Sequence, residues 1–163
     1  MKKILLLAAA LLLLIGTAIG ADPPDVKEGL WSIHTQTIDN PGSKKSESST
    51  TICRSHAYDQ HVQSLSKSAM KGCTLKESSE GSKHISELHC VVAGTAIETK
   101  GTSVFQGDTS THSETHTTYT PAFYGVTDST MTQDQKYLGS CPAGVQPGDL
   151  TLADGTVNHL WKH

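Results

Sequence analysis

Four cysteines follow an amino-terminal export signal, and together these two features limit what this chain can fold into. The cysteines are Cys53, Cys73, Cys90 and Cys141. Residues 1–21 carry two early lysines, an apolar run and small residues near position 20, which is the pattern of a cleavable signal peptide. The run is shorter than the roughly 20 apolar residues of a membrane-spanning helix. Exported proteins can keep disulfides, so residues 22–163 are predicted to form one disulfide-stabilised domain.

The mature chain is acidic. Removing Lys2 and Lys3 from the 13 basic residues leaves 11 against 16 acidic ones, a formal charge of −5. Nucleic-acid binding needs a concentrated basic surface, and the longest basic run after the leader is Lys44-Lys45. No nucleic-acid partner is therefore expected. The short lysine-containing leader is typical of bacteria and predicts a periplasmic or secreted protein with no stable membrane span after cleavage.

The sequence is predicted to fold mainly as antiparallel β structure with one helix. Segments rich in Thr, Ser and Val alternate with turn residues, and the first two strands are expected near residues 26–38 and 45–53. The apolar spacing then becomes helical over about residues 56–70, with Ser55 as the N-cap. The residues that share the apolar helix face are Tyr58, Val62, Leu65 and Ala69.

A β-hairpin centred on Gly81-Ser82 is the clearest local prediction. Glycine at the first central position suits a type II′ turn, and the resulting register pairs residues whose numbers sum to 163. Three favourable cross-strand pairs result: Glu80 with Lys83, Lys76 with Glu87, and Leu75 with Leu88. The same register places Cys73 opposite Cys90, at a separation that a disulfide can bridge.

Two disulfide connectivities stay open on the sequence alone. The hairpin register favours Cys73–Cys90, which leaves Cys53 for Cys141. The rival scheme joins Cys53 to Cys73 across the two ends of the helix, and Cys90 to Cys141. In both schemes all four cysteines are structural, and the chain has no Cys-x-x-Cys redox motif.

A second hairpin is expected around Gly107-Asp108, between strands at about residues 95–106 and 109–120, with a further strand at about 124–138. Consecutive strands joined by short turns form an up-and-down meander. A long meander protects its edges by becoming curved or barrel-like. The tail from about residue 150 is expected to be mobile.

Five apolar side chains on the expected inner strand faces are candidates to line a ligand cavity. They are Trp31, Ile33, Leu75, Leu88 and Phe105. A packed core is the commoner use of apolar strand faces. A core without a cavity is therefore the alternative interpretation of these residues.

Nine histidines supply potential metal ligands, and His112, Glu114 and His116 form the sharpest group. The expected register of the second hairpin places His112 and Glu114 on the same face as Phe105. His112 and His116 are about 13 Å apart on an extended strand, too far to chelate one ion together. These three residues define an alternative metal-binding hypothesis, against the simpler interpretation of a wet polar surface.

The sequence contains no recognised catalytic signature. It lacks the Gly-x-Ser-x-Gly nucleophile motif, a phosphate loop and a dinucleotide fingerprint. A non-catalytic protein without a cofactor is therefore predicted.

Three segments of the chain match a known family in order and in cysteine placement. They are Glu28-Gly29-Leu30-Trp31, the run of Cys53, Cys73 and Cys90 followed by Gly107-Asp108, and the stretch from Leu138 to Asp149. Together they resemble the bacterial family of domains of unknown function numbered 3617. Ser140 stands where an acidic residue is usual in that family. The resemblance implies export, paired cysteines and a β-rich fold, and it brings no catalytic residues.

These observations predict an exported envelope protein that acts as a non-catalytic binding or interaction module. Its partner is expected to be a small hydrophobic or amphipathic ligand held in the curved sheet, or another envelope protein. The alternative is a histidine-based metal-binding protein of the periplasm.

Overall fold

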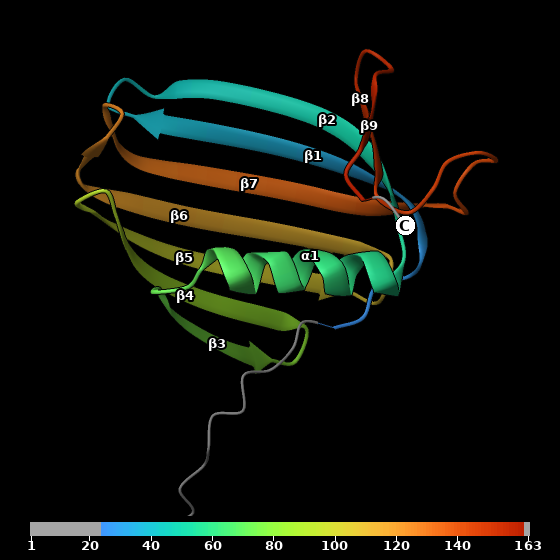
Figure 1. Ribbon diagram of the computed structural model, residues 1–163, viewed down its shortest axis with the longest axis horizontal. Coiled ribbons are helices and arrows are strands. Elements are labelled where there is room, and N and C mark those ends of the chain that lie inside the picture. Colours follow the sequence, from blue (N-terminus) through green and yellow to red (C-terminus); the bar gives the residue numbers. More distant parts are fainter. Residues whose placement is uncertain (1–23, 162–163) are drawn as a thin grey trace, which may run out of the picture.

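The computed structural model describes residues 24–161, so the predicted signal peptide at residues 1–21 lies outside the described residues. The described chain forms one curved antiparallel sheet, and a helix lies across its concave face (Figure 1). Within these residues no helix is both long and apolar enough to cross a membrane. The predicted β-rich fold with one helix is confirmed.

One helix and nine strands make up the described residues, and most of them follow each other through tight turns. In chain order they are β1 (Gly29–Asn40), β2 (Lys44–Arg54), α1 (His56–Ala69), β3 (Thr74–Glu80), β4 (Lys83–Val92), β5 (Thr95–Gln106), β6 (Ser110–Phe123), β7 (Val126–Gly139), β8 (Asp149–Leu152) and β9 (Val157–His159).

The strand order is β3-β4-β5-β6-β7-β1-β2-β8-β9. Strands β3 to β7 form the predicted meander, whereas β1 lies between β7 and β2 and pairs with both. Strands β3 and β9 are the two free edges of the described sheet, so the sheet is curved but open. Of the two predicted forms, curved or barrel-like, the described sheet takes the curved one and is not closed.

The helix α1 runs back along the strands on the concave side of the sheet (Figure 1). Its 14 residues make it about 21 Å long at 1.5 Å per residue. It returns the chain from the end of β2 to the start of β3, and these two strands are far apart in the sheet order. The curvature of the sheet places them on the two sides of α1 (Figure 1).

The first hairpin has the predicted register. Strands β3 and β4 pair Leu75 with Leu88 and Glu80 with Lys83, and every pair sums to 163. The disulfide Cys73–Cys90 extends this register by one pair, with its Cα atoms 4.4 Å apart. The second disulfide, Cys53–Cys141, has a Cα separation of 5.6 Å. The connectivity that the hairpin register favours is therefore the one present.

The second hairpin differs from the prediction by one residue. Its loop contains three residues, Gly107 to Thr109, so Gln106 pairs with Ser110 and Phe105 pairs with Thr111. Since strand side chains alternate between faces, this shift moves every residue of β6 to the opposite side relative to β5. The prediction that His112 shares a face with Phe105 is therefore wrong.

The core is small and lies at one end of the sheet. It consists of Val26, Trp31, Ile52 and Tyr58. Trp31 is completely buried, and its indole Nε1 donates a hydrogen bond to the Lys27 carbonyl at 2.8 Å. Tyr58 is the buried residue of α1. The helix is thus anchored to the sheet through its first turn.

The carboxy-terminal segment joins the same core. We predicted a mobile tail from about residue 150, whereas β8 pairs with β2 and β9 pairs with β8. The Trp161 ring packs against Tyr58, with ring centroids 6.0 Å apart. Gly148 makes room for this contact, since a Cβ there would lie 2.7 Å from the Trp161 Cβ. The segment therefore forms one wall beside the start of α1.

The two disulfides should stabilise the fold unequally. Cys53–Cys141 closes a loop of 88 residues and Cys73–Cys90 a loop of 17. In the chain-entropy model the longer loop contributes about 4.5 kcal/mol and the shorter about 3 kcal/mol. We expect urea unfolding of the variant Cys53→Ala/Cys141→Ala to show the larger loss of unfolding free energy. An equal or larger loss in Cys73→Ala/Cys90→Ala would contradict this ranking.

Candidate functional site

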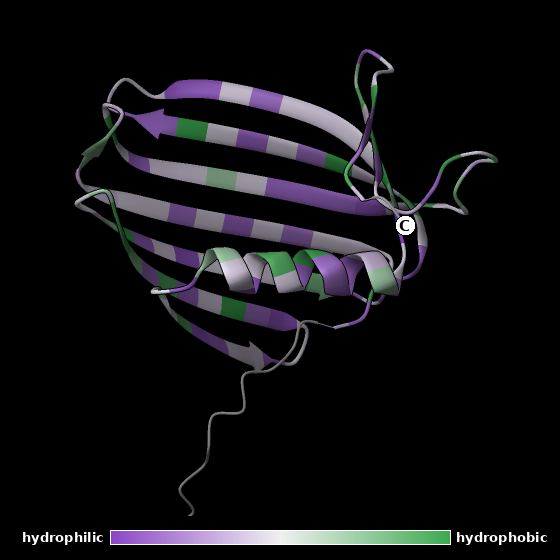
Figure 2. Ribbon diagram, viewed as in Figure 1, coloured by the Kyte–Doolittle hydropathy of each residue, from purple (hydrophilic) through white to green (hydrophobic). Residues whose placement is uncertain are grey.

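Alternation along the strands places neutral and ionic side chains on opposite faces of the sheet. On the concave face, which faces α1, one cross-strand row is formed by Phe105, Thr111, Gln135 and Ile33. The row beside it on the convex face is formed by Val104, His112, Asp134 and His34. Figure 2 shows how few strongly hydrophobic residues the strands under α1 carry. The concave face is therefore a polar but largely uncharged surface.

A groove of about 540 Å³ lies between α1, residues 24–26 and the concave face. Its apolar side chains from the sheet are Ile33, Ile52 and Phe105. The polar ones from β5, β6 and β7 are Ser103, Thr111, Ser113 and Gln135. The helix contributes His56, Tyr58, Asp59, Gln60, Val62 and Gln63. The groove thus combines apolar side chains with hydrogen-bonding ones, and its ionisable groups come from α1, β2 and the segment before β1.

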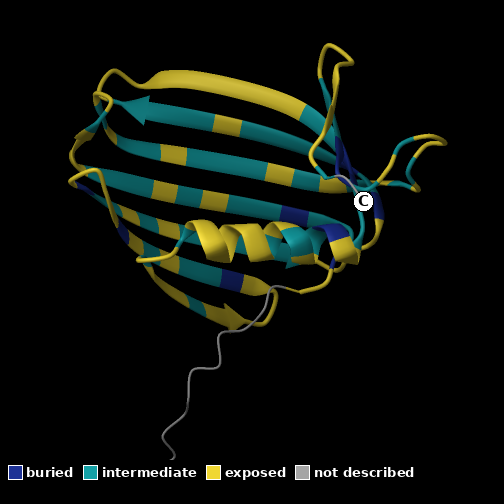
Figure 3. Ribbon diagram, in the orientation of Figure 1, coloured by how far each residue is buried: buried dark blue, intermediate teal, exposed yellow. Residues whose placement is uncertain are grey.

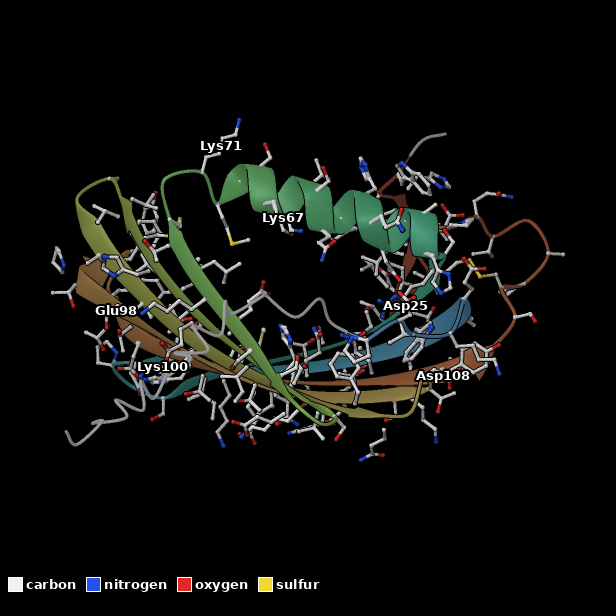
Figure 4. The ribbon with its side chains drawn as sticks, turned by 90° about the horizontal axis from the view of Figure 1, so that it is seen from below. Asp25, Lys67, Lys71, Glu98, Lys100 and Asp108 are labelled. Carbon is white, nitrogen blue, oxygen red and sulfur yellow. A yellow bond between two sulfur atoms is a disulfide. The ribbon has the colours of Figure 1, made fainter. Side chains whose placement is uncertain are left out.

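The helix covers this groove without packing tightly onto the sheet. In α1 the buried residue is Tyr58 in the first turn, and Figure 3 shows the helix exposed along most of its remaining length. Val62 is 39% exposed and Leu65 is 56% exposed, although both lie on the predicted apolar face. A surface helix ordinarily buries such a face. The side view in Figure 4 shows α1 raised above the strands on the concave side.

Arg54 lines the groove and connects the helix to the sheet. Its Nε donates to the Asp59 carboxylate and one Nη donates to the Gln135 carboxamide oxygen, both at 3.0 Å. Its guanidinium also lies 5.2 Å from the centre of the Trp31 ring, within cation–π range. Asp59 stands in the first turn of α1, where the helix dipole favours a negative charge. Arg54 therefore joins β2, α1 and β7 while its own charge is neutralised.

The segment before β1 closes one side of the groove. His56 Nε2 lies 3.1 Å from the Val26 carbonyl, and because a carbonyl only accepts, this nitrogen carries the proton. The His56 backbone N–H donates to the Glu28 carboxylate at 2.8 Å. Burial raises the pKa of the Tyr58 hydroxyl, and the nearby Asp59 carboxylate adds to the effect. The start of α1 is thus held on the sheet side and on the amino-terminal side.

The predicted ligand-facing residues are only partly brought together. Ile33 and Phe105 line the groove, but Trp31 is fully buried in the core and does not. Leu75 and Leu88 pair with each other on β3 and β4 and are absent from the groove. The reason is the breadth of the sheet, because the groove occupies only the part near the first half of α1.

Sequence reasoning missed the polar residues of the groove. Arg54, Asp59 and Gln135 come from β2, α1 and β7, and only folding brings them together. One signal was present in the sequence, because Arg54 is the single arginine of the chain and directly follows Cys53. Arginine is the residue best suited to several simultaneous hydrogen bonds in a partly buried position.

The predicted metal group lies on the convex face and is not assembled into a site. His112 Nδ1 is 2.7 Å from the Asp134 carboxylate, and its Nε2 is 3.5 Å from Glu114. His116 instead hydrogen-bonds to the Thr130 hydroxyl at 3.2 Å. Among residues 24–161, no group of three or more His, Cys, Asp or Glu side chains is placed to hold a metal ion.

The ion pair on the convex face should make stability depend on pH. The hydrogen bond to Asp134, followed by that to Glu114, raises the pKa of His112. The stabilisation that this ion pair gives is complete below the pKa of histidine in the unfolded chain, about 6.5. It is lost as the pH rises through the higher pKa that His112 has in the folded protein. We expect the stability advantage of the parent over Asp134→Asn in urea unfolding to shrink from pH 6 to pH 8.5. A gap that stays constant with pH would contradict this assignment.

The comparisons with known proteins give a family for the chain. No curated protein matches it. The family model described as "Protein of unknown function (DUF3617)" matches residues 26–141. This region runs from the first core residue, Val26, to Cys141 in the longer disulfide, so it contains both disulfides and all the groove residues except Pro24 and Asp25. Since the match covers more than half of the sequence, the chain belongs to the DUF3617 family.

Proposed function

We propose that this protein is an exported, non-catalytic binding module of the bacterial envelope that holds a small amphipathic ligand beneath α1. The observation that carries the proposal is the groove of about 540 Å³ between the helix and the concave face. Small-molecule pockets commonly have volumes of about 300–1,000 Å³. The groove is therefore large enough for a ligand.

The composition of the groove supports an amphipathic ligand. Ile33, Ile52 and Phe105 offer apolar surface on the sheet side of the groove. Ser113, Gln135 and their neighbours offer hydrogen-bonding groups. Such a mixture of apolar walls with a few convergent polar groups is typical of ligand sites. A ligand here would also cover Val62, which the protein itself leaves partly exposed.

The two disulfides support a rigid frame around this groove. Cys53 lies two residues before the N-cap Ser55, and Cys73 follows the end of α1 at Ala69. Each end of the helix is thus cross-linked to another part of the chain, which opposes collapse of the groove. Disulfides form in oxidising compartments. Together with the predicted signal peptide, they support an extracytoplasmic location.

The polar groups around the groove favour binding over catalysis. Arg54 is engaged by Asp59 and Gln135. The His56 ring hydrogen-bonds to the Val26 carbonyl and lies beside the Glu28 carboxylate. These contacts fix the start of α1. A general base or a nucleophile would instead need a free position facing the ligand.

A bulky side chain on the helix should block the groove. We expect Val62→Trp to weaken binding of the neutral fluorescent probe N-phenyl-1-naphthylamine at least tenfold in fluorescence titrations of the oxidised mature protein. Val62 lines the groove and is partly exposed, so the substitution fills space without disturbing the core. The matched control is Ser64→Trp, at an exposed position of α1 that is not part of the groove. Equal weakening in both variants, or no binding by the parent protein, would refute the proposal.

Native mass spectrometry provides a second test of the same proposal. The protein is taken from the periplasm under non-denaturing conditions and weighed without a denaturing step. A retained small molecule that is released by Val62→Trp but not by Ser64→Trp is expected.

A further inference from the structure

The concave face contains hydrogen-bonding side chains without ionisable ones over a wide area. This holds for the inward-facing positions of the four central strands from the Phe105 row to the Gly101 row; the next row reaches Asp39 on β1. These positions are Phe105, Ser103 and Gly101 on β5; Thr111, Ser113 and Thr115 on β6; Gln135, Gln133 and Met131 on β7; and Ile33, Thr35 and Thr37 on β1. No Asp, Glu, Lys, Arg or His stands among them.

The convex face of the same strands has the opposite composition. Its corresponding positions include His34, Lys100, His112, Glu114 and Asp134. Figure 4 shows Glu98 and Lys100 on the side of the sheet away from α1. Both faces come from the same strands and both are polar. Contact with water therefore does not by itself explain why the ionisable residues of these rows lie on the convex face.

Two ionisable groups that line the groove, Arg54 and Asp59, are already paired with each other. Arg54 and Asp59 form an ion pair at 3.0 Å, with side chains only 20% and 28% exposed. A ligand carboxylate would have to compete with Asp59 for this guanidinium, and a ligand cation would have to compete with Arg54. Removing one partner from a partly buried pair leaves an uncompensated charge, which is costly. Asp25 also borders the groove and disfavours an anionic group.

The uncharged side chains form hydrogen bonds with one another on the concave face. Ser103 and Ser113 hydroxyls lie 2.8 Å apart, and the Gln133 amide donates to the Thr35 hydroxyl at 3.1 Å. The Gln135 amide donates in turn to the Gln133 carboxamide oxygen. Hydroxyl and carboxamide groups both donate and accept. They therefore match ligand hydroxyls, which also do both, while Phe105 and Ile33 offer apolar surface to ligand C–H groups.

From this arrangement we infer that the polar part of the ligand is a neutral, hydroxyl-rich group of the sugar type. This inference rests on the proposed binding function and adds the chemical class of the ligand. The source is a free sugar or the head group of a glycolipid, which share this chemistry. A fatty acid is disfavoured because Asp59 already neutralises Arg54 and Asp25 repels a second carboxylate. A cationic amphiphile is disfavoured because Arg54 already occupies Asp59, and Asp25 is exposed to solvent, where an ion pair contributes little.

The inference is tested by competition between amphiphiles that differ only in the head group. Decyl glucoside, decanoate and decyltrimethylammonium, each below its micelle concentration, are titrated against the oxidised mature protein loaded with N-phenyl-1-naphthylamine. We expect decyl glucoside to displace the probe at least tenfold more effectively than either charged compound. Equal or better displacement by decanoate or by the ammonium compound would overturn the inference. Probe binding itself would still uphold the proposed function, so the two failures are distinguishable.

Free glucose separates the two sources. Displacement of the probe by glucose alone supports a soluble sugar as the ligand. Displacement only when the decyl chain is attached supports a glycolipid. Failure of both glucose and decyl glucoside to displace a bound probe would overturn the assignment to sugars.

A pair of substitutions tests the hydroxyl groups directly. Ser103 and Ser113 hydrogen-bond to each other, and replacing both partners by small apolar groups is nearly neutral for folding. We expect Ser103→Ala/Ser113→Ala to weaken decyl glucoside about tenfold, the effect of one or two lost hydrogen bonds, with unchanged probe affinity. The control Thr102→Ala/Thr132→Ala lies on the convex face, where both residues pair with Glu114. Unchanged glucoside affinity in the serine variant would overturn the inference.

Discussion

The cross-linked helix α1 is the constraint on which the rest of this structure depends. The chain leaves β2, crosses the concave face in α1 and enters β3 at the far edge of the sheet. Disulfides lie beside both ends of this crossing, at Cys53 and Cys73. The helix runs along the strands on the concave side of the sheet and occupies the space between its two curved flanks (Figure 1). A groove lies between this helix and the concave face.

Packing is concentrated where the helix begins. Trp31, Ile52 and Tyr58 form the buried cluster, with Trp161 against Tyr58 on the carboxy-terminal side. Away from this cluster the concave face carries mostly Ser, Thr and Gln, so little apolar area is available for α1 to bury. A helix held mainly by its first turn and by covalent links beyond its ends can stay in place without filling the space beneath it. This division between a packed end and an open end is the physical basis of the proposed binding function.

The two hairpins show how far local patterns reach. At Gly81-Ser82 the turn residues and three favourable pairs agree on one register, and that register with its disulfide is confirmed. At Gly107 the same reasoning chose a two-residue loop, but the loop has three residues. No charge pair or cysteine was available there to distinguish the two registers. The predicted register was wrong by one residue, and this exchanged the two faces of β6. His112 and Glu114 were therefore assigned to the wrong face, and the groove residues Thr111 and Ser113 were missed.

The sequence by itself determined the β-rich class, the position of α1 from its N-cap and apolar spacing, the first hairpin and the favoured disulfides. These follow from interactions between residues close in the chain, where turn chemistry and periodicity are strong. The tertiary structure alone decided that β1 lies between β7 and β2, that the sheet stays open, and that Arg54, Asp59 and Gln135 meet. Pairing between β1 and β7 joins residues about a hundred positions apart, and its register depends on packing around Trp31. No local period encodes that contact, so the groove becomes visible only when the chain is folded.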